Sequence, residues 1–325
     1  MSYSMLRSLL FCLATIVLTA CASPAVPSKP NTPLDAATPP SWRSELAEVD
    51  GEQLEYWLSR APQARATLVF ENGLMLPLTT WQTVASAFTE RCNVLVYNRA
   101  GVGRSSVPEE AQAPEHTAQQ LQRLLQQLMP DRPSVPTVLV GHSLGGQYVQ
   151  LFARQYPELV SGIVLVDALP VGTVKPVAEF PWYTRFGLWL FAPESAQREI
   201  SHIAPMGEAL LANTDPFQKP MVRLVAATDP VAHKPEGLIK DLLKGALYAE
   251  DFGVWALDPD VAEARMNELY PQASVRVLQT PHRIQESNPA AVIDAINLLL
   301  DSIEHERAQA NIDAVSENAA SADRQ

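Results

Sequence analysis

The clearest chemical signal in the chain is a serine inside a glycine-rich run. Ser143 stands in Gly141–Gly146, which follows the apolar run Thr137–Val140 and precedes an apolar helical pattern. A sharp turn from a strand into a helix brings neighbouring backbone too close for a Cβ atom, so it requires glycines. The serine then lies at the amino end of a helix, where the dipole and free N–H groups favour an oxyanion. We predict that Ser143 is a nucleophile.

A serine hydroxyl is a poor nucleophile and needs a nearby base. His282 is the candidate, because it lies between the apolar run Ser274–Gln279 and the final helical pattern. That loop belongs to the carboxyl edge of the predicted sheet, on the same side as Ser143. His142 is next to the serine but cannot turn back onto it. Surface positions are the default for the remaining histidines, His116, His202, His233 and His305.

The elements that must position these residues alternate regularly along the chain. The predicted strands are short, β-branched and apolar nearly throughout, as strands buried on both faces should be. They are Ala66–Glu71, Asn93–Asn98, Thr137–Val140, Gly162–Asp167, Arg223–Thr228 and Ser274–Gln279, with an antiparallel edge hairpin within Glu48–Ser59.

Helical patterns separate these strands. Leucines at 121, 124, 125 and 128 share one helical face, and Asn288 with Pro289 forms the start of a final amphipathic helix. Strand and helix in repetition predict an α/β fold: a mostly parallel, doubly wound sheet of about eight strands.

One segment, at about 170–220, interrupts the alternation. It contains no convincing strand but many aromatic side chains, and we predict a helical insertion over the carboxyl edge of the sheet. Two interpretations stay open: the aromatics seat the insertion on the domain, or they also line an apolar substrate pocket. They are Phe180, Trp182, Tyr183, Phe186, Trp189 and Phe191.

Four blocks along the chain resemble the α/β-hydrolase superfamily, over nearly the whole predicted domain at 46–303. They are Glu71–Leu74, Tyr97–Ser105, Gly141–Gly146, and His282 with Ile284, Gln285 and Pro289. The resemblance implies that the backbone N–H groups of Leu74 and Leu144 form an oxyanion hole. Asn72 stands where the family more often has histidine, and Asn98 replaces the aspartate of its D-x-R-G-x-G-x-S turn.

A catalytic acid should orient the histidine and stabilise its cationic form. The family places its acid after the strand that follows the nucleophile, or after the next strand. Asp167 fits the first position and is our first choice, with Asp229 as the alternative for the second. Asp258 and Asp260 remain open if 254–257 forms the later strand instead.

The chain begins with a predicted signal peptide over 1–20. Its apolar run ends in Leu18-Thr19-Ala20-Cys21, which resembles a bacterial lipobox, so Cys21 would carry lipid. The alternative is an ordinary secretory signal with a chance cysteine.

A Pro- and Ala-rich tether follows at 21–45, and we expect a disordered tail over 304–325. We expect a lipid-anchored protein facing the periplasm, at the outer rather than the inner membrane. Cys92 is expected to pack in the core.

Composition narrows the function further. The net charge of −12 argues against a nucleic-acid partner. The chain carries no metal-ligand cluster and no dinucleotide-binding glycine pattern, so we expect no metal and no cofactor. We predict a serine hydrolase that acts on an apolar ester or other small acyl compound. Acyl transfer or perhydrolysis on the same residues, and a non-catalytic lipoprotein, are the alternatives.

Overall fold

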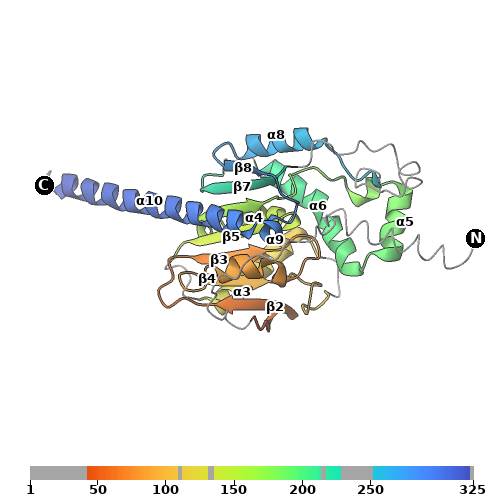
Figure 1. The fold of residues 1–325 in the computed structure, drawn as a ribbon, viewed down its shortest axis with the longest axis horizontal. Helices are drawn as coiled ribbons and strands as arrows, with labels where there is room; N and C mark the ends of the chain where they lie inside the picture. The colour runs from red at the N-terminus through yellow and green to blue at the C-terminus, as the bar shows by residue number, and fades with distance from the viewer. Residues whose placement is uncertain (1–41, 109–111, 131–134, 214–216, 228–251, 323–325) are drawn as a thin grey trace, which may run out of the picture.

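Eight strands form one sheet in the computed structural model, which describes residues 42–108, 112–130, 135–213, 217–227 and 252–322 (Figure 1). The strands are β1 (Glu45–Val49), β2 (Glu52–Ser59), β3 (Thr67–Glu71), β4 (Asn93–Tyr97), β5 (Thr137–His142), β6 (Gly162–Val166), β7 (Met221–Ala226) and β8 (Ser274–Leu278). Their order across the sheet is β1-β2-β4-β3-β5-β6-β7-β8.

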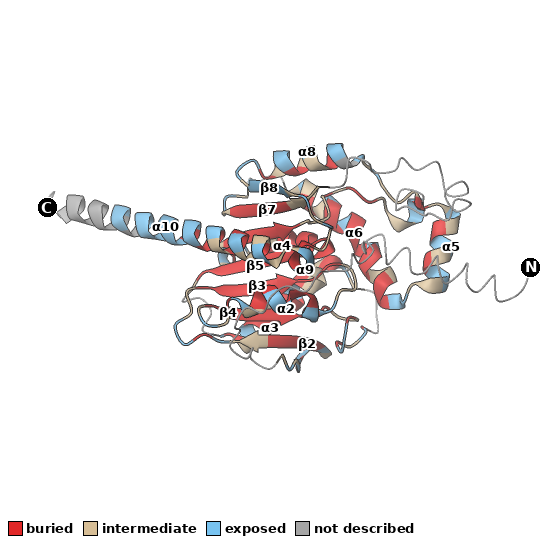
Figure 2. Cartoon of the chain, viewed as in Figure 1, coloured by how far each residue is buried: buried red, intermediate tan, exposed pale blue. Residues whose placement is uncertain are grey.

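The sheet is parallel from β4 to β8, and the hairpin β1–β2 extends it antiparallel at one edge. The predicted fold class is therefore confirmed. Its parallel strands are apolar along their length because both faces are covered. Leu68 and Phe70 pack on one side, and Val69 between them packs on the other. Figure 2 shows this buried layer running through the centre of the molecule.

The helices cover both faces of the sheet and one of its ends (Figure 1). They are α2 (Gln82–Ser86), α3 (Pro114–Leu128), α4 (Leu144–Gln155), α5 (Trp182–Phe191), α6 (Glu194–Ala212), α8 (Pro259–Leu269), α9 (Ile284–Ser287) and α10 (Pro289–Ala322), with 3₁₀ turns η1 (Leu78–Trp81), η3 (Pro157–Leu159) and η4 (Val177–Glu179). The cluster around Val69 includes α3 and α4, and the cluster around Phe70 includes α2 and the first turns of α10. No helix within the described residues is both long enough and apolar enough to cross a bilayer.

The helix α10 runs far beyond the sheet (Figure 1). The expected disordered tail over 304–325 is therefore wrong for its described part, 304–322. The prediction relied on the loss of an apolar face, but residues 290–322 contain neither glycine nor proline and are rich in alanine. These residues favour a helix without tertiary contacts. Arg65 also holds Asp301 and Glu304 at 2.9 and 2.8 Å, where α10 leaves the sheet.

The insertion over 170–220 contains α5 and α6, which lie together at one end of the sheet (Figure 1). Its aromatic side chains include a buried group and an exposed group, and neither interpretation predicted the exposed group. Phe180 is buried and lines a cavity, as the second interpretation expects. Trp182, Phe186 and Trp189 instead lie on the outer face of α5 and are 74%, 51% and 68% exposed.

Candidate active site

Ser143 lies in the turn between β5 and α4. Its φ of 52° and ψ of −121° are unusual for a residue with a side chain, and such strain persists only where the surroundings impose it. A Cβ atom at Gly145 would lie 2.4 Å from the carbonyl oxygen of Asn72 and 2.6 Å from that of Glu71. The turn therefore packs against the end of β3, and only glycine fits there. This is the sharp turn that the sequence predicts.

Asp167 and His282 meet at the carboxyl edge of the sheet. Asp167 follows β6, and its Oδ2 lies 2.5 Å from the Nδ1 atom of His282. Its other carboxylate oxygen accepts a hydrogen bond of 2.8 Å from the backbone N–H of Ala226, at the end of β7. The backbone N–H of Asp167 donates to Leu224 at 2.7 Å. The carboxylate is thus fixed on the neighbouring strand and has one oxygen aimed at the imidazole.

The alternative acids have other positions. Asp258 caps α8 by accepting a hydrogen bond of 3.0 Å from the backbone N–H of Asp260. Asp260 lines a second cavity, which also reaches Asp167 and His282. Asp229 lies outside the described residues. The segment 254–257, which was the alternative strand, forms only an isolated bridge from Trp255 to Val174.

His142 connects the turn that contains Ser143 to the loop that contains His282. The sequence analysis did not predict this role. Its Nε2 donates to the backbone carbonyl of His282 at 3.1 Å, and the two rings lie 4.7 Å apart. The ring also lies against Gly73, where a Cβ atom would come within 2.8 Å of Nδ1. Burial, together with the nearby His282, lowers the pKa of His142 well below its usual value. A neutral ring therefore holds three segments of the site together, and its place directly before the serine was the available signal.

The predicted oxyanion donors, Leu74 and Leu144, both line the same cavity as Ser143. Leu144 is the first residue of α4, where N–H groups have no partner within the helix. Among the described residues, neither amide donates a backbone hydrogen bond in the turns and loops. Two N–H groups near one serine are the arrangement that binds a developing oxyanion.

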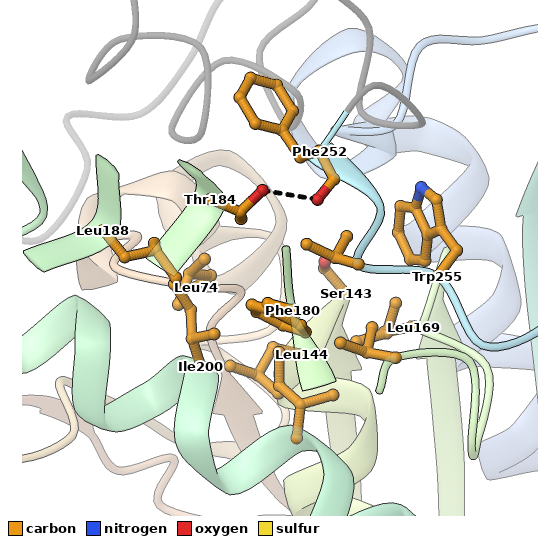
Figure 3. A pocket seen from close by; sticks show the side chains of 13 residues that line it. Leu74, Ser143, Leu144, Leu169, Phe180, Thr184, Leu188, Ile200, Phe252 and Trp255 are labelled. Carbon is orange, nitrogen blue, oxygen red and sulfur yellow. Dashed lines mark hydrogen bonds between the residues drawn. The ribbon is translucent and has the colours of Figure 1, made fainter. Parts of the chain in front are cut away.

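The cavity at Ser143 is apolar and has a volume of about 140 Å³ (Figure 3). An engineered cavity of about 150 Å³ is large enough for a benzene molecule. The side-chain hydroxyls described in its lining are those of Ser143 and Thr184, and Thr184 donates to the carbonyl of Phe252 at 2.7 Å. Leucine, isoleucine, valine and aromatic side chains form the rest: Leu74, Leu144, Leu169, Val174, Phe180, Leu188, Ile200, Ile203, Phe252, Val254 and Trp255.

The two asparagines that depart from the family pattern have structural partners. Asn72 donates to the carbonyl of Tyr97 at 2.8 Å and is buried. Asn98 donates to Glu55 at 2.7 Å and accepts from the backbone N–H of Leu78 at 2.7 Å. Burial raises the pKa of Glu55, but hydrogen bonds from its neighbours, including Asn98, outweigh this effect and bring that pKa to about 2. An aspartate at 98 would place a second carboxylate against Glu55, so the amide suits this chain.

One of the two cysteines named from the sequence lies among the described residues. Cys92 is free and buried in the core, and burial raises the pKa of its thiol. The expectation that it packs rather than reacts is consistent with that position. Cys21 lies outside the described residues.

Comparison with known proteins gives a consistent picture. The model of the "Alpha/beta hydrolase family" matches residues 68–295. The sn-1-specific diacylglycerol lipase ABHD11 of Mus musculus is 31% identical over 147 residues, which are 45% of this chain and 47% of that protein. The uncharacterized protein YqjL of Bacillus subtilis is 26% identical over 39% of this chain and 49% of its own length. The chain thus spans about half the length of these two curated relatives.

Several solved structures share the fold. A hydrolase from Pseudomonas aeruginosa PA01 aligns with a TM-score of 0.55 and 20% identity, over 80% of this chain and 99% of its own. Cfl2 from Burkholderia cenocepacia aligns with a TM-score of 0.55 and 17% identity, over 78% of this chain and 94% of its own. A thermophilic esterase from Thermogutta terrifontis aligns with a TM-score of 0.54 and 18% identity, over 80% and 99%. At these identities the likeness shows the fold alone.

Proposed function

The chain belongs to the alpha/beta hydrolase family, and we propose that it is a serine hydrolase that cleaves apolar esters through an acyl-enzyme. One observation carries the proposal: a carboxylate of Asp167 lies 2.5 Å from Nδ1 of His282. The backbone of that histidine is in turn bonded to the residue before Ser143. These contacts support a catalytic triad formed from three separate loops.

In the proposed reaction, Ser143 attacks the carbonyl carbon of the ester and His282 takes the hydroxyl proton. Asp167 holds the imidazole with its Nδ1–H toward the carboxylate, which leaves Nε2 to act as the base. The N–H groups of Leu74 and Leu144 stabilise the oxyanion. His282 then returns the proton to the departing alcohol. A water molecule, activated in the same way, releases the acid from Ser143.

The cavity supports a substrate with an apolar acyl group. Its described lining contains no charged side chain, and burial of each methylene there contributes about 0.8 kcal/mol. A volume of about 140 Å³ suits a short or medium acyl chain or a single ring. The likeness to a diacylglycerol lipase over part of the chain agrees with an ester of lipid character. Serine at position 143 disfavours reactions that proceed through an ester to aspartate.

Labelling with a fluorophosphonate probe tests this function, because the probe reacts with an activated serine. The wild-type protein should take the label and hydrolyse p-nitrophenyl butyrate, and Ser143→Ala should do neither. Ser201→Ala is the control: its exposed hydroxyl donates within α6 to the carbonyl of Arg198, and the substitution should leave both signals unchanged. A folded wild-type protein with neither signal would favour the non-catalytic alternative. Product analysis with added alcohol or peroxide separates hydrolysis from acyl transfer and perhydrolysis.

We also propose that lipid on Cys21 anchors the protein to the cell envelope, facing the periplasm at the outer membrane. The lipobox-like Leu18–Cys21 sequence supports lipidation of Cys21. Two or more acyl chains give stable anchoring, whereas one gives only weak binding. In a bacterial host grown with labelled palmitate, the wild-type protein should take the label and Cys21→Ser should not. Cys92→Ser is the control and should be labelled like the wild-type protein. A Cys21→Ser protein that still takes the label would contradict the lipid anchor.

A further inference from the structure

Behind the serine turn, a buried cluster of three charged side chains connects the sheet to the insertion. Arg99, which follows β4, contacts Glu71 at 2.5 Å and Glu199 at 2.6 Å. Their side chains are 3%, 1% and 5% exposed. Glu71 ends β3, whereas Glu199 lies on α6 of the insertion. The cluster therefore joins two parts of the fold that are separated by more than 100 residues.

Arg99 also fixes the peptide group that precedes Leu74. Its guanidinium donates to the carbonyl of Asn72 at 2.6 Å and to that of Gly73 at 3.0 Å. The C=O and N–H bonds of a trans peptide point in opposite directions. Since the Gly73 carbonyl points toward Arg99, the N–H of Leu74 must point away from it. This orients the amide that the proposed reaction uses as an oxyanion donor.

Glu199 holds the next peptide group, which joins Leu74 to Met75. The backbone N–H of Met75 donates to Glu199 Oε2 at 2.8 Å, and the Nε of Arg99 donates to Oε1 at 2.7 Å. Met75 has a φ of 53°, a left-handed conformation that is uncommon for a residue with a Cβ atom and needs outside support. Glu199 supplies that support from α6. The next residue on α6, Ile200, lines the cavity with Leu74 (Figure 3).

A second contact one turn along α6 fixes this helix against the domain. His202 accepts a hydrogen bond of 2.8 Å at Nδ1 from the hydroxyl of Tyr148 on α4, and its Nε2 donates to the carbonyl of Gln112 at 2.7 Å. Arg99 also stacks over the Tyr148 ring at 4.7 Å. The position of α6 is thus set relative to the helix that follows Ser143. Because Glu199 lies on α6 and accepts from the Met75 N–H, the position of α6 also determines the position of the Leu74–Met75 turn.

We propose that Glu199 is a positioning residue for the oxyanion hole, through which helix α6 of the insertion sets the orientation of the Leu74 amide. The inference rests on the proposed hydrolase function and deepens it. In a purely structural role, the cluster would only hold the two segments together, and removing one partner would destabilise the fold without changing the chemistry. The two roles differ in what they do to the transition state. Stabilisation of the fold does not change kcat in the folded protein, whereas a misplaced donor does.

The test compares Glu199→Gln and Glu199→Ala with the wild-type protein. The glutamine variant keeps the size of the side chain but replaces one acceptor oxygen with an NH₂ group, so it loses either the bond from Met75 or both contacts from Arg99. Because small misplacements at a reacting centre cost up to about 100-fold in rate, we expect kcat to fall about 10- to 100-fold with KM nearly unchanged. Glu194→Gln is the control, since Glu194 lies on the same helix with a side chain that is 79% exposed.

A trifluoromethyl ketone supplies the second measurement, because it adds to a serine hydroxyl and forms an oxyanion like that of the reaction. Its affinity should fall in Glu199→Gln by the same factor as kcat/KM, while the melting temperature and circular dichroism show a folded protein. Should the alanine variant not fold, the glutamine variant decides. Unchanged kcat and ketone affinity in a folded Glu199→Gln would overturn the proposal. That failure is distinct from failure of the hydrolase function, in which wild-type protein takes no fluorophosphonate label.

Discussion

Replacing Asp167 by asparagine should lower kcat for ester hydrolysis about 10⁴-fold, with KM changed only slightly. The reason is the tautomer of His282. Asp167 Oδ1 accepts from the backbone N–H of Ala226, so an asparagine must place its carbonyl oxygen there. Its NH₂ group then faces His282 Nδ1, which has to act as an acceptor. The ring proton moves to Nε2, and that nitrogen can no longer take the proton of Ser143.

The controls for this substitution are the other acids considered from the sequence. Asp260→Asn removes a charge from the cavity beside His282 but breaks no described contact to the imidazole, so it should change kcat less than about threefold. Asp229→Asn should be equally mild. Steady-state kinetics on one soluble ester, with circular dichroism to verify folding, measures all three variants. A loss of about 10⁴-fold in Asp229→Asn with little effect in Asp167→Asn would reassign the acid.

Sequence reasoning proposes the serine and the histidine because their constraints are local. The serine turn needs glycines, and Gly145 is needed because the ends of β3 and the turn nearly touch. The histidine follows a recognisable last strand. The acid was left open because two of the strands predicted from the sequence are followed or ended by an aspartate, Asp167 and Asp229. The choice depends on the position of the His282 ring, which only coordinates supply.

Sequence patterns could not predict other features of the site, because these features join segments that are distant in the sequence. Glu199 and Arg99 are 100 positions apart, and nothing in the α6 sequence distinguishes a buried glutamate from a solvated one. The cavity lining likewise combines Val254 and Trp255 with residues of the insertion. The prediction of a disordered tail was wrong for the opposite reason, because it neglected a local property of the sequence. Residues 304–322 obey helix propensity, which acts locally, although no apolar face requires a helix there.

The largest loss of stability is expected for Arg99→Met, which should lower the free energy of unfolding by about 3–5 kcal/mol at pH 7. The substitution keeps an unbranched stem but leaves Glu71 and Glu199 buried without a cation. Burial raises the pKa of Glu71 even in the wild-type protein, and Arg99 opposes that rise. Urea denaturation followed by circular dichroism measures the loss. Arg104→Met is the matched control, because Arg104 is 53% exposed and its pair with Glu55 should contribute less than about 1 kcal/mol.

The pH dependence of the Arg99→Met protein separates lost charge balance from lost packing. A carboxyl whose pKa is higher in the folded than in the unfolded state binds protons on folding, so its destabilising effect is greatest above the folded pKa and shrinks as pH falls through that value. The deficit relative to wild type should therefore be smaller at pH 5 than at pH 7. Adding Glu71→Gln should recover part of the stability at pH 7 and weaken the pH dependence. A deficit that is equal at both pH values would mean that Arg99 acts through its contacts with Tyr148 and the backbone rather than through its charge.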